Sequence, residues 1–212
     1  MHQTESLRRC SMAIALAMAV LLLPGASVAQ LGGLLPPPPT ITTSSVTGDA
    51  SVVRSTVLGM TTALGDTGTL SGINQARDAS MLLGSISPAL SGETLSASTI
   101  SWANEVDSEA SLTNLNMTVA GIGLTADLVM AQASQIVGSA GSGSSTLSNL
   151  AINGLPINVT GAPNQTISIP GGRVILNEQT VSSTGAAVVN ALHVSVLGVA
   201  DVVIASATAG IS

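Results

Sequence analysis

Few residues in this sequence have side chains suited to catalysis. His193 is the single histidine after the first thirty residues, and Ser195 follows it two positions later. A serine hydrolase needs a nucleophile, a general base and an orienting carboxylate, but the sequence has no Gly-x-Ser-x-Gly motif to supply the nucleophile. We therefore interpret His193 as a polar residue on the outer face of a strand. No catalytic or cofactor-binding residue is assigned, and a secreted hydrolase is the third function that we consider.

Three carboxylates alternate in one short stretch, at Glu105, Asp107 and Glu109. On an extended backbone, alternate side chains share one face. The three are therefore candidate ligands for Ca²⁺, which prefers oxygen ligands. The alternative that we favour is a solvated acidic face that discourages pairing at the edge of a sheet. Asp127 and Asp201 each precede an apolar run, and we expect them to cap the amides of turns.

The composition excludes several classes of protein. The chain has a net charge of −6, with no Tyr or Phe, and its single Trp is Trp102. Nucleic-acid binding needs basic patches and stacking rings, so we exclude it. Protein-binding surfaces and carbohydrate sites also depend on Tyr and Trp, so the near absence of these residues argues against a strong binder that relies on aromatic rings. We expect a surface that is kept soluble by Ser, Thr, Asn and a few acids.

The N-terminus has the organisation of an export signal. Arg8 and Arg9 precede an apolar run of thirteen residues (SMAIALAMAVLLL), and small residues follow it. This order predicts a signal peptide over residues 1–29, cleaved between Ala29 and Gln30. A membrane anchor is the alternative, but a spanning helix needs about 20 apolar residues. Cys10 lies in the removed segment, so we expect no disulfide and no thiolate metal site.

The remaining chain divides into a spacer and one domain. Residues 30–45 contain four consecutive prolines, which favour a stiff extended conformation. From residue 46 to residue 212, short runs of Val, Ile, Leu, Thr and Ala alternate with turn residues, which predicts successive strands. Residues 73–90 are ambiguous and include a candidate short helix, whereas residues 139–145 (SAGSGSS) predict a flexible loop.

Three hairpins are indicated in the C-terminal half. Asn153-Gly154 is a strong turn signal, because both residues tolerate positive φ. Pro156 has no N–H, which predicts an edge position or a bulge for the strand that follows. A second turn falls at Pro170-Gly171, and the third hairpin joins residues 188–197 to residues 199–209. Residues 112–134 echo this last hairpin in sequence, so we expect two similar hairpins in one sheet system.

A series of ordered motifs lies along the predicted domain, at residues 108–111, 126–127, 143–146, 153–154, 160–166, 169–172, 177–179, 189–194 and 201–207. In these motifs the sequence resembles the choice-of-anchor P family of exported bacterial proteins, and the resemblance spans about residues 50–211. It implies an exported surface domain without a known enzymatic activity or ligand. The chain stops at Ser212 without a sorting motif or hydrophobic tail, so we expect a released protein.

Together these features predict an all-β, antiparallel domain, a two-layer β-sandwich built of successive hairpins. The function that we expect is a non-catalytic, secreted or cell-surface structural or interaction domain. Its expected partners are components of the cell envelope or the extracellular matrix, with no nucleic acid and no membrane span after cleavage of the signal. A Ca²⁺-dependent or glycan-dependent adhesive domain is the second function that we consider.

Overall fold

The computed structural model describes residues 45–212, which form thirteen strands and no helix. The predicted signal peptide and almost all of the predicted spacer lie outside the described residues. Within residues 45–212 there is no helix of the length and apolar character needed to span a bilayer. The strands are β1 (Val46–Val57), β2 (Met60–Asp66), β3 (Gln75–Ile86), β4 (Leu90–Ser101), β5 (Glu105–Val119), β6 (Ile122–Ile136), β7 (Ser142–Ser148), β8 (Ala151–Ile152), β9 (Leu155–Pro156), β10 (Gln165–Ile169), β11 (Gly172–Val181), β12 (Ala187–Val196) and β13 (Ala200–Ile211).

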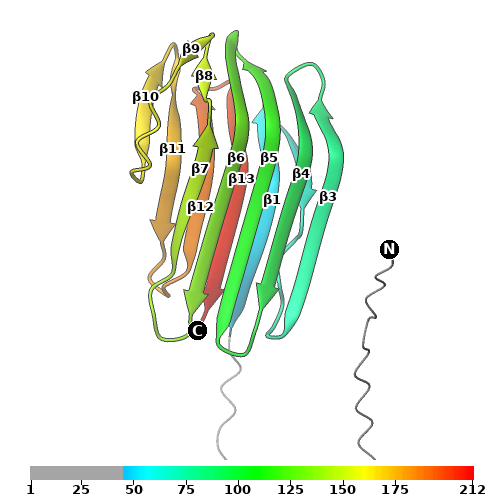
Figure 1. The fold of residues 1–212 in the computed structure, drawn as a ribbon, viewed down its shortest axis with the longest axis vertical. Coiled ribbons are helices and arrows are strands. Elements are labelled where there is room, and N and C mark those ends of the chain that lie inside the picture. The colour runs from blue at the N-terminus through cyan, green and yellow to red at the C-terminus, as the bar shows by residue number, and fades with distance from the viewer. Residues whose placement is uncertain (1–44) are drawn as a thin grey trace, which may run out of the picture. The chain divides into compact units, whose positions relative to one another are not determined.

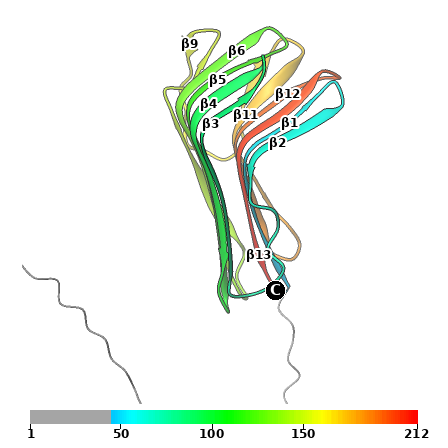
Figure 2. The same ribbon diagram turned by 90° about the vertical axis from the view of Figure 1, so that its right-hand side faces the viewer.

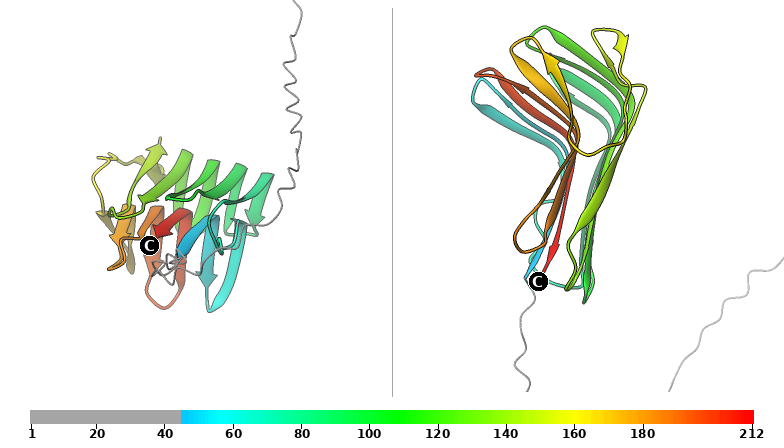
Figure 3. Two further views of the ribbon diagram at one scale, coloured as in Figure 1. Left: turned by 90° about the horizontal axis from the view of Figure 1, so that it is seen from below. Right: turned by 90° about the vertical axis from the view of Figure 1, so that its left-hand side faces the viewer.

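The strands form two antiparallel sheets that pack face to face, so the predicted β-sandwich is confirmed (Figure 1). Sheet A has the order β10-β11-β12-β13-β1-β2, and sheet B has the order β3-β4-β5-β6-β8-β9, with β7 also paired to β6. The chain starts in sheet A, builds sheet B, and returns to sheet A, where β13 pairs with β1. Figure 3 shows the two layers stacked on each other.

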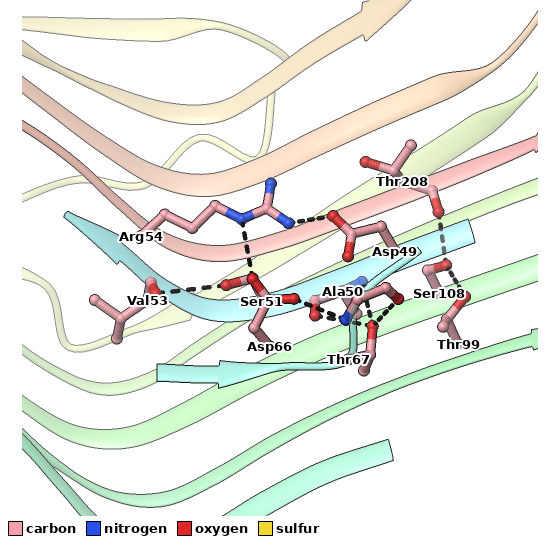
Figure 4. Close-up of polar contacts among 11 residues, drawn as sticks. Asp49, Ala50, Ser51, Val53, Arg54, Asp66, Thr67, Thr99, Ser108 and Thr208 are labelled. Atoms are coloured by element: carbon pink, nitrogen blue, oxygen red, sulfur yellow. Dashed lines mark hydrogen bonds and ion pairs between the residues drawn. The ribbon is translucent and has the colours of Figure 1, made fainter. Parts of the chain in front are cut away.

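The core lies between the sheets and is built from small aliphatic side chains. β13 runs along the middle of it and packs against β5 and β6. Ala207 and Ala209 of β13 are fully buried, as are Ala110 of β5 and Ala131 of β6. Small residues at these positions allow the two sheets to approach closely without any Phe or Tyr. The hydroxyl of Ser108 also crosses the core and donates to the carbonyl oxygen of Thr208 at 2.6 Å (Figure 4).

Both sheets bend about half-way along their strands, and the outer face of sheet A lies on the inside of the bend (Figure 2). Within the strands, five residues have a positive φ: Gly65 (58°), Thr94 (45°), Asn114 (50°), Asn177 (51°) and Ala205 (54°). These left-handed residues interrupt the extended backbone where the strands change direction. Four of the five are not glycine, so the bend is held against a local conformational cost.

In sheet A, the left-handed residues fall on a single line across the strands. Asn177 of β11, Ala205 of β13 and Gly65 of β2 are left out of the regular Cα pairing, and so are Ala191 and Val52 between them. The pairs on the two sides of this line are Leu176–Leu192–Ile204–Val53–Leu64 and Glu178–Asn190–Ser206–Ser51–Asp66. We call this line the crease.

The bend reverses the alternation of buried and exposed side chains. β5 buries even-numbered residues from Val106 to Leu112, but odd-numbered residues from Leu115 to Val119. The change occurs at Asn114, which has a positive φ. β13 changes in the same way at Ala205. A long strand of this protein therefore has no single two-residue period.

The structure resolves one ambiguous stretch and contradicts one expectation for local structure. The candidate helix within residues 73–90 is the edge strand β3, because pairing with β4 overrides the helix propensity of this stretch. The expected flexible loop at residues 139–145 contains the start of β7, which pairs with β6. At Gly143 a Cβ atom would collide with Val189 of β12, so the glycine permits close packing of β7 on sheet A.

The predicted hairpins are confirmed, but the expected relationship between two of them is not. Asn153 and Gly154 both have positive φ and join β8 to β9, and Pro156 lies in an edge strand. The β5–β6 and β12–β13 hairpins lie in different sheets, where they face each other across the core. Their registers also differ, since Leu115 pairs with Ala126 whereas Leu192 pairs with Ile204.

Candidate functional site

Sheet B carries a groove of about 570 Å³ on its outer face, near the end of the sandwich where β4 turns into β5. Antiparallel register places outward-facing residues of β4, β5, β6 and β7 side by side in two rows. One row is Ile100–Asp107–Ser134–Ser142, and the other is Ser98–Glu109–Gln132–Ser144. Trp102 lies in the turn after β4 and also lines the groove. The volume is within the range typical of small-molecule sites.

The three alternating carboxylates do share the outer face of β5, as the sequence predicted. Glu105, Asp107 and Glu109 are half-buried, and the residues between them are buried. However, β5 lies between β4 and β6 in the middle of sheet B. The interpretation that these acids protect a sheet edge is therefore wrong. They lie on the broad outer face of sheet B, and two of them, Asp107 and Glu109, line the groove.

The spacing of these acids does not bring them together around a cation. Alternate residues of a strand are about 6.8 Å apart, whereas Ca²⁺ holds its oxygen ligands at about 2.3–2.6 Å. Within residues 45–212, no group of three or more His, Cys, Asp or Glu side chains could hold a metal ion. The outer face of β5 thus presents separate carboxylates along a row rather than a coordination sphere.

Asp107 and Glu109 have different surroundings. The pKa of Asp107 is raised above its ordinary value. The larger cause is burial of the Asp107 carboxyl, and the smaller one is repulsion from Glu105. Glu109 accepts a hydrogen bond of 2.7 Å from the side-chain amide of Gln132. A ligand in the groove would thus meet one carboxyl that burial makes easier to protonate, and one that a neighbouring amide already orients.

A second polar cluster lies on sheet A and was missed in the sequence. The Nδ1 atom of His193 is 2.9 Å from Oε2 of Glu178, and its Nε2 atom is 3.1 Å from Oδ2 of Asp201. The amide of Asn190 donates to the same oxygen of Glu178 at 2.7 Å. Asp201 therefore contacts an imidazole across the hairpin rather than capping a turn. Asp127, also expected to be a cap, accepts a hydrogen bond from Asn149.

The contacts of His193 decide what this cluster can do chemically. A neutral imidazole donates from one nitrogen only, so it can donate to one of the two carboxylates, whereas a doubly protonated ring can donate to both. A general base must instead offer a free nitrogen to its nucleophile. Both ring nitrogens already face carboxylates, and Ser195 makes no hydrogen bond with the ring among the described residues. The arrangement is structural, because His193 of β12 links Glu178 of β11 to Asp201 of β13.

Arg54 forms ion pairs on the same outer face of sheet A. The guanidinium of Arg54 contacts the carboxylate of Asp49, and its Nε atom lies 3.9 Å from Oδ2 of Asp66 (Figure 4). Arg54 is on one side of the crease, and both carboxylates are on the other. Charged contacts therefore cross the crease in two places, at Arg54 and at His193.

The fold and the two clusters define an antiparallel β-sandwich with a polar groove on one sheet and charged ties on the other. Comparison of the chain with protein-family models, with curated proteins and with solved structures found no match. The resemblance to the choice-of-anchor P family stays a prediction.

Proposed function

We propose that this chain is an exported, non-catalytic interaction domain that contacts components of the cell envelope or the extracellular matrix. The observation that carries the proposal is the groove across β4–β7, a polar hollow on the outer face of a continuous sheet. Regular strands fix the positions of its side chains more firmly than loops would. Such a surface is suited to holding a partner in place.

The surroundings of His193 support a non-catalytic role. The ring is tied to Glu178 and Asp201, so it has no free nitrogen with which to activate a nucleophile. A secreted hydrolase makes a separate prediction, namely that His193→Ala abolishes an activity found by screening hydrolase substrates. A protein with no such activity, or an active His193→Ala variant, removes the hydrolase alternative.

Support for export comes from the sequence. The charged start, the apolar run and the small residues before Gln30 have the order of a cleaved signal peptide. The resemblance to the choice-of-anchor P family, which is a prediction from the sequence, agrees with a role outside the cytoplasm. We therefore place the mature domain beyond the inner membrane, in contact with the envelope or with secreted material.

Cell fractionation tests this proposal directly. Protein expressed from the full sequence should be recovered outside the cytoplasm in association with envelope or matrix, and mass spectrometry should find its N-terminus at Gln30. A variant lacking residues 2–29 should stay in the cytoplasm, which controls for release by lysis. Recovery of the protein from the cytoplasm, or as a released extracellular pool that binds neither envelope nor matrix, would contradict the proposal.

A further inference from the structure

We propose that the groove on sheet B binds a saccharide chain that is neutral or carries amines, and that it rejects acidic saccharides. This inference rests on the proposed interaction function and names the ligand class for the same site. It is argued from three properties of the groove: the two rows of polar side chains, the apolar wall beside them, and the sign of the charge.

The first property is the arrangement of the polar side chains. The rows across β4–β7 present the hydroxyls of Ser98, Ser134, Ser142 and Ser144, together with the amide of Gln132. Hydroxyls both donate and accept, whereas carboxylates only accept. Four strands at about 4.8 Å spacing extend this array over about 14 Å. A polyol chain, whose own hydroxyls donate and accept in turn, matches such an extended array.

The second property is the apolar wall. Trp102 has 43% of its surface exposed, and Ile100 next to it has 37%. Both line the groove at the end of β4. An exposed indole provides a flat apolar surface and an N–H donor. The apolar face of a sugar ring can therefore lie on Trp102 while its hydroxyls reach the rows on β5 and β6.

The third property is charge. Asp107 and Glu109 line the groove, and the other described residues around it include no Arg, Lys or His. A uronic acid in this position would meet two carboxyls with no compensating cation, and like charges in a partly desolvated site repel. A neutral saccharide avoids this repulsion, and an amine-bearing saccharide gains attraction. Charge thus selects among saccharides that have the same shape.

The single tryptophan provides a specific measurement. Because the chain has no Tyr and no other Trp, its intrinsic emission reports on Trp102 alone. We would titrate the mature protein with neutral hexasaccharides of glucose, galactose and mannose, with a chitosan hexamer, and with hexagalacturonate. A saturable emission change with a neutral hexasaccharide or the chitosan hexamer, and none with hexagalacturonate, is the expected result. No change with any neutral or amine-bearing probe, or an equal response to hexagalacturonate, would overturn the inference.

Variants separate binding in the groove from binding elsewhere. Trp102→Ala should weaken binding of a neutral hexasaccharide at least about tenfold, measured by calorimetry because this variant has no emission. Glu109→Gln should instead allow hexagalacturonate to bind, because one of the two repelling carboxyls is gone. Asp127→Asn is the matched control, since its carboxylate is exposed on β6 outside the groove. The inference would also be overturned if Trp102→Ala bound the neutral hexasaccharide as tightly as the control does, or if Glu109→Gln bound hexagalacturonate no better than the control does. If the domain is recovered with the envelope but binds no saccharide, this inference is wrong, whereas the proposed function is still supported.

Discussion

The Nδ1 atom of His193 lies 2.9 Å from Oε2 of Glu178, and the two residues are on opposite sides of the crease in sheet A. The contact therefore joins the two halves of a sheet that is bent by left-handed residues. Arg54 crosses the same crease to reach Asp49 and Asp66. On the inside of the bend these contacts oppose the straightening of the sheet, which gives the only histidine of the described chain a structural role.

Removing Glu178 should weaken the fold more than removing Asp201. Glu178 accepts from both His193 and Asn190, and its side chain is 23% exposed, whereas that of Asp201 is 59% exposed. We expect Glu178→Ala to lower the free energy of unfolding by about 2 kcal/mol. Asp201→Ala should cost less than about 1 kcal/mol, because exposed ion pairs contribute little. Urea denaturation measures both, and equal losses would contradict the assignment of the crease contact.

The left-handed conformation at Asn114 can be tested against a neighbour. Asn114 and Asn116 are both exposed on β5, but only Asn114 has a positive φ. Asn114→Val should lower the free energy of unfolding by about 2 kcal/mol, because β-branched residues rarely adopt this conformation. Asn116→Val should change it by less than about 0.5 kcal/mol. Asn114→Gly should stay near the wild type, and similar losses for the two valine variants would argue against the bend as described.

Much of the fold could be predicted from the sequence, because turn residues mark the hairpins. Asn153-Gly154 and Pro170-Gly171 locate their turns correctly. The bend could not be predicted, since Thr94, Asn114 and Ala205 stand in runs that read as continuous strand. At each of these residues the alternation of buried and exposed side chains shifts by one position. A single two-residue period therefore assigns one half of the strand to the wrong face of the sheet. The strand β7 was hidden by its small residues, whose role depends on contacts with sheet A.

The two clusters differ in how far the sequence could indicate them. Glu105, Asp107 and Glu109 are alternate residues of one strand, so their shared face followed from spacing alone. The partners of His193 come from β11 and β13, and only the strand order of sheet A brings them together. The groove likewise combines residues from four strands around Trp102. No local pattern encodes such combinations.

Asp107 should make stability depend on pH. Its pKa is raised in the folded state, so its protonated form is favoured by folding. This contribution is fully present below the ordinary pKa of an aspartate and is lost as the pH rises through the raised folded value. Asp107→Asn should therefore match the wild type near about pH 3 and exceed it at about pH 7, by less than about 1 kcal/mol at this half-exposed position.

Thermal melts across that pH range measure this difference. Glu105→Gln should reduce the pH dependence of the wild type, because repulsion from Glu105 is the second cause of the shift. A difference between Asp107→Asn and the wild type that stays constant with pH would show that the carboxyl is not perturbed.

The central claim is that the groove on sheet B is the surface through which this domain contacts its surroundings. Co-sedimentation of purified variants with isolated envelope from the producing cells tests it most directly. The Trp102→Ala/Glu109→Gln variant should bind at least about tenfold more weakly than the wild type. The Leu155→Ala/Asp127→Asn variant, which changes an exposed apolar residue and an acid outside the groove, should bind as the wild type does. Equal binding by the two double variants would contradict the account.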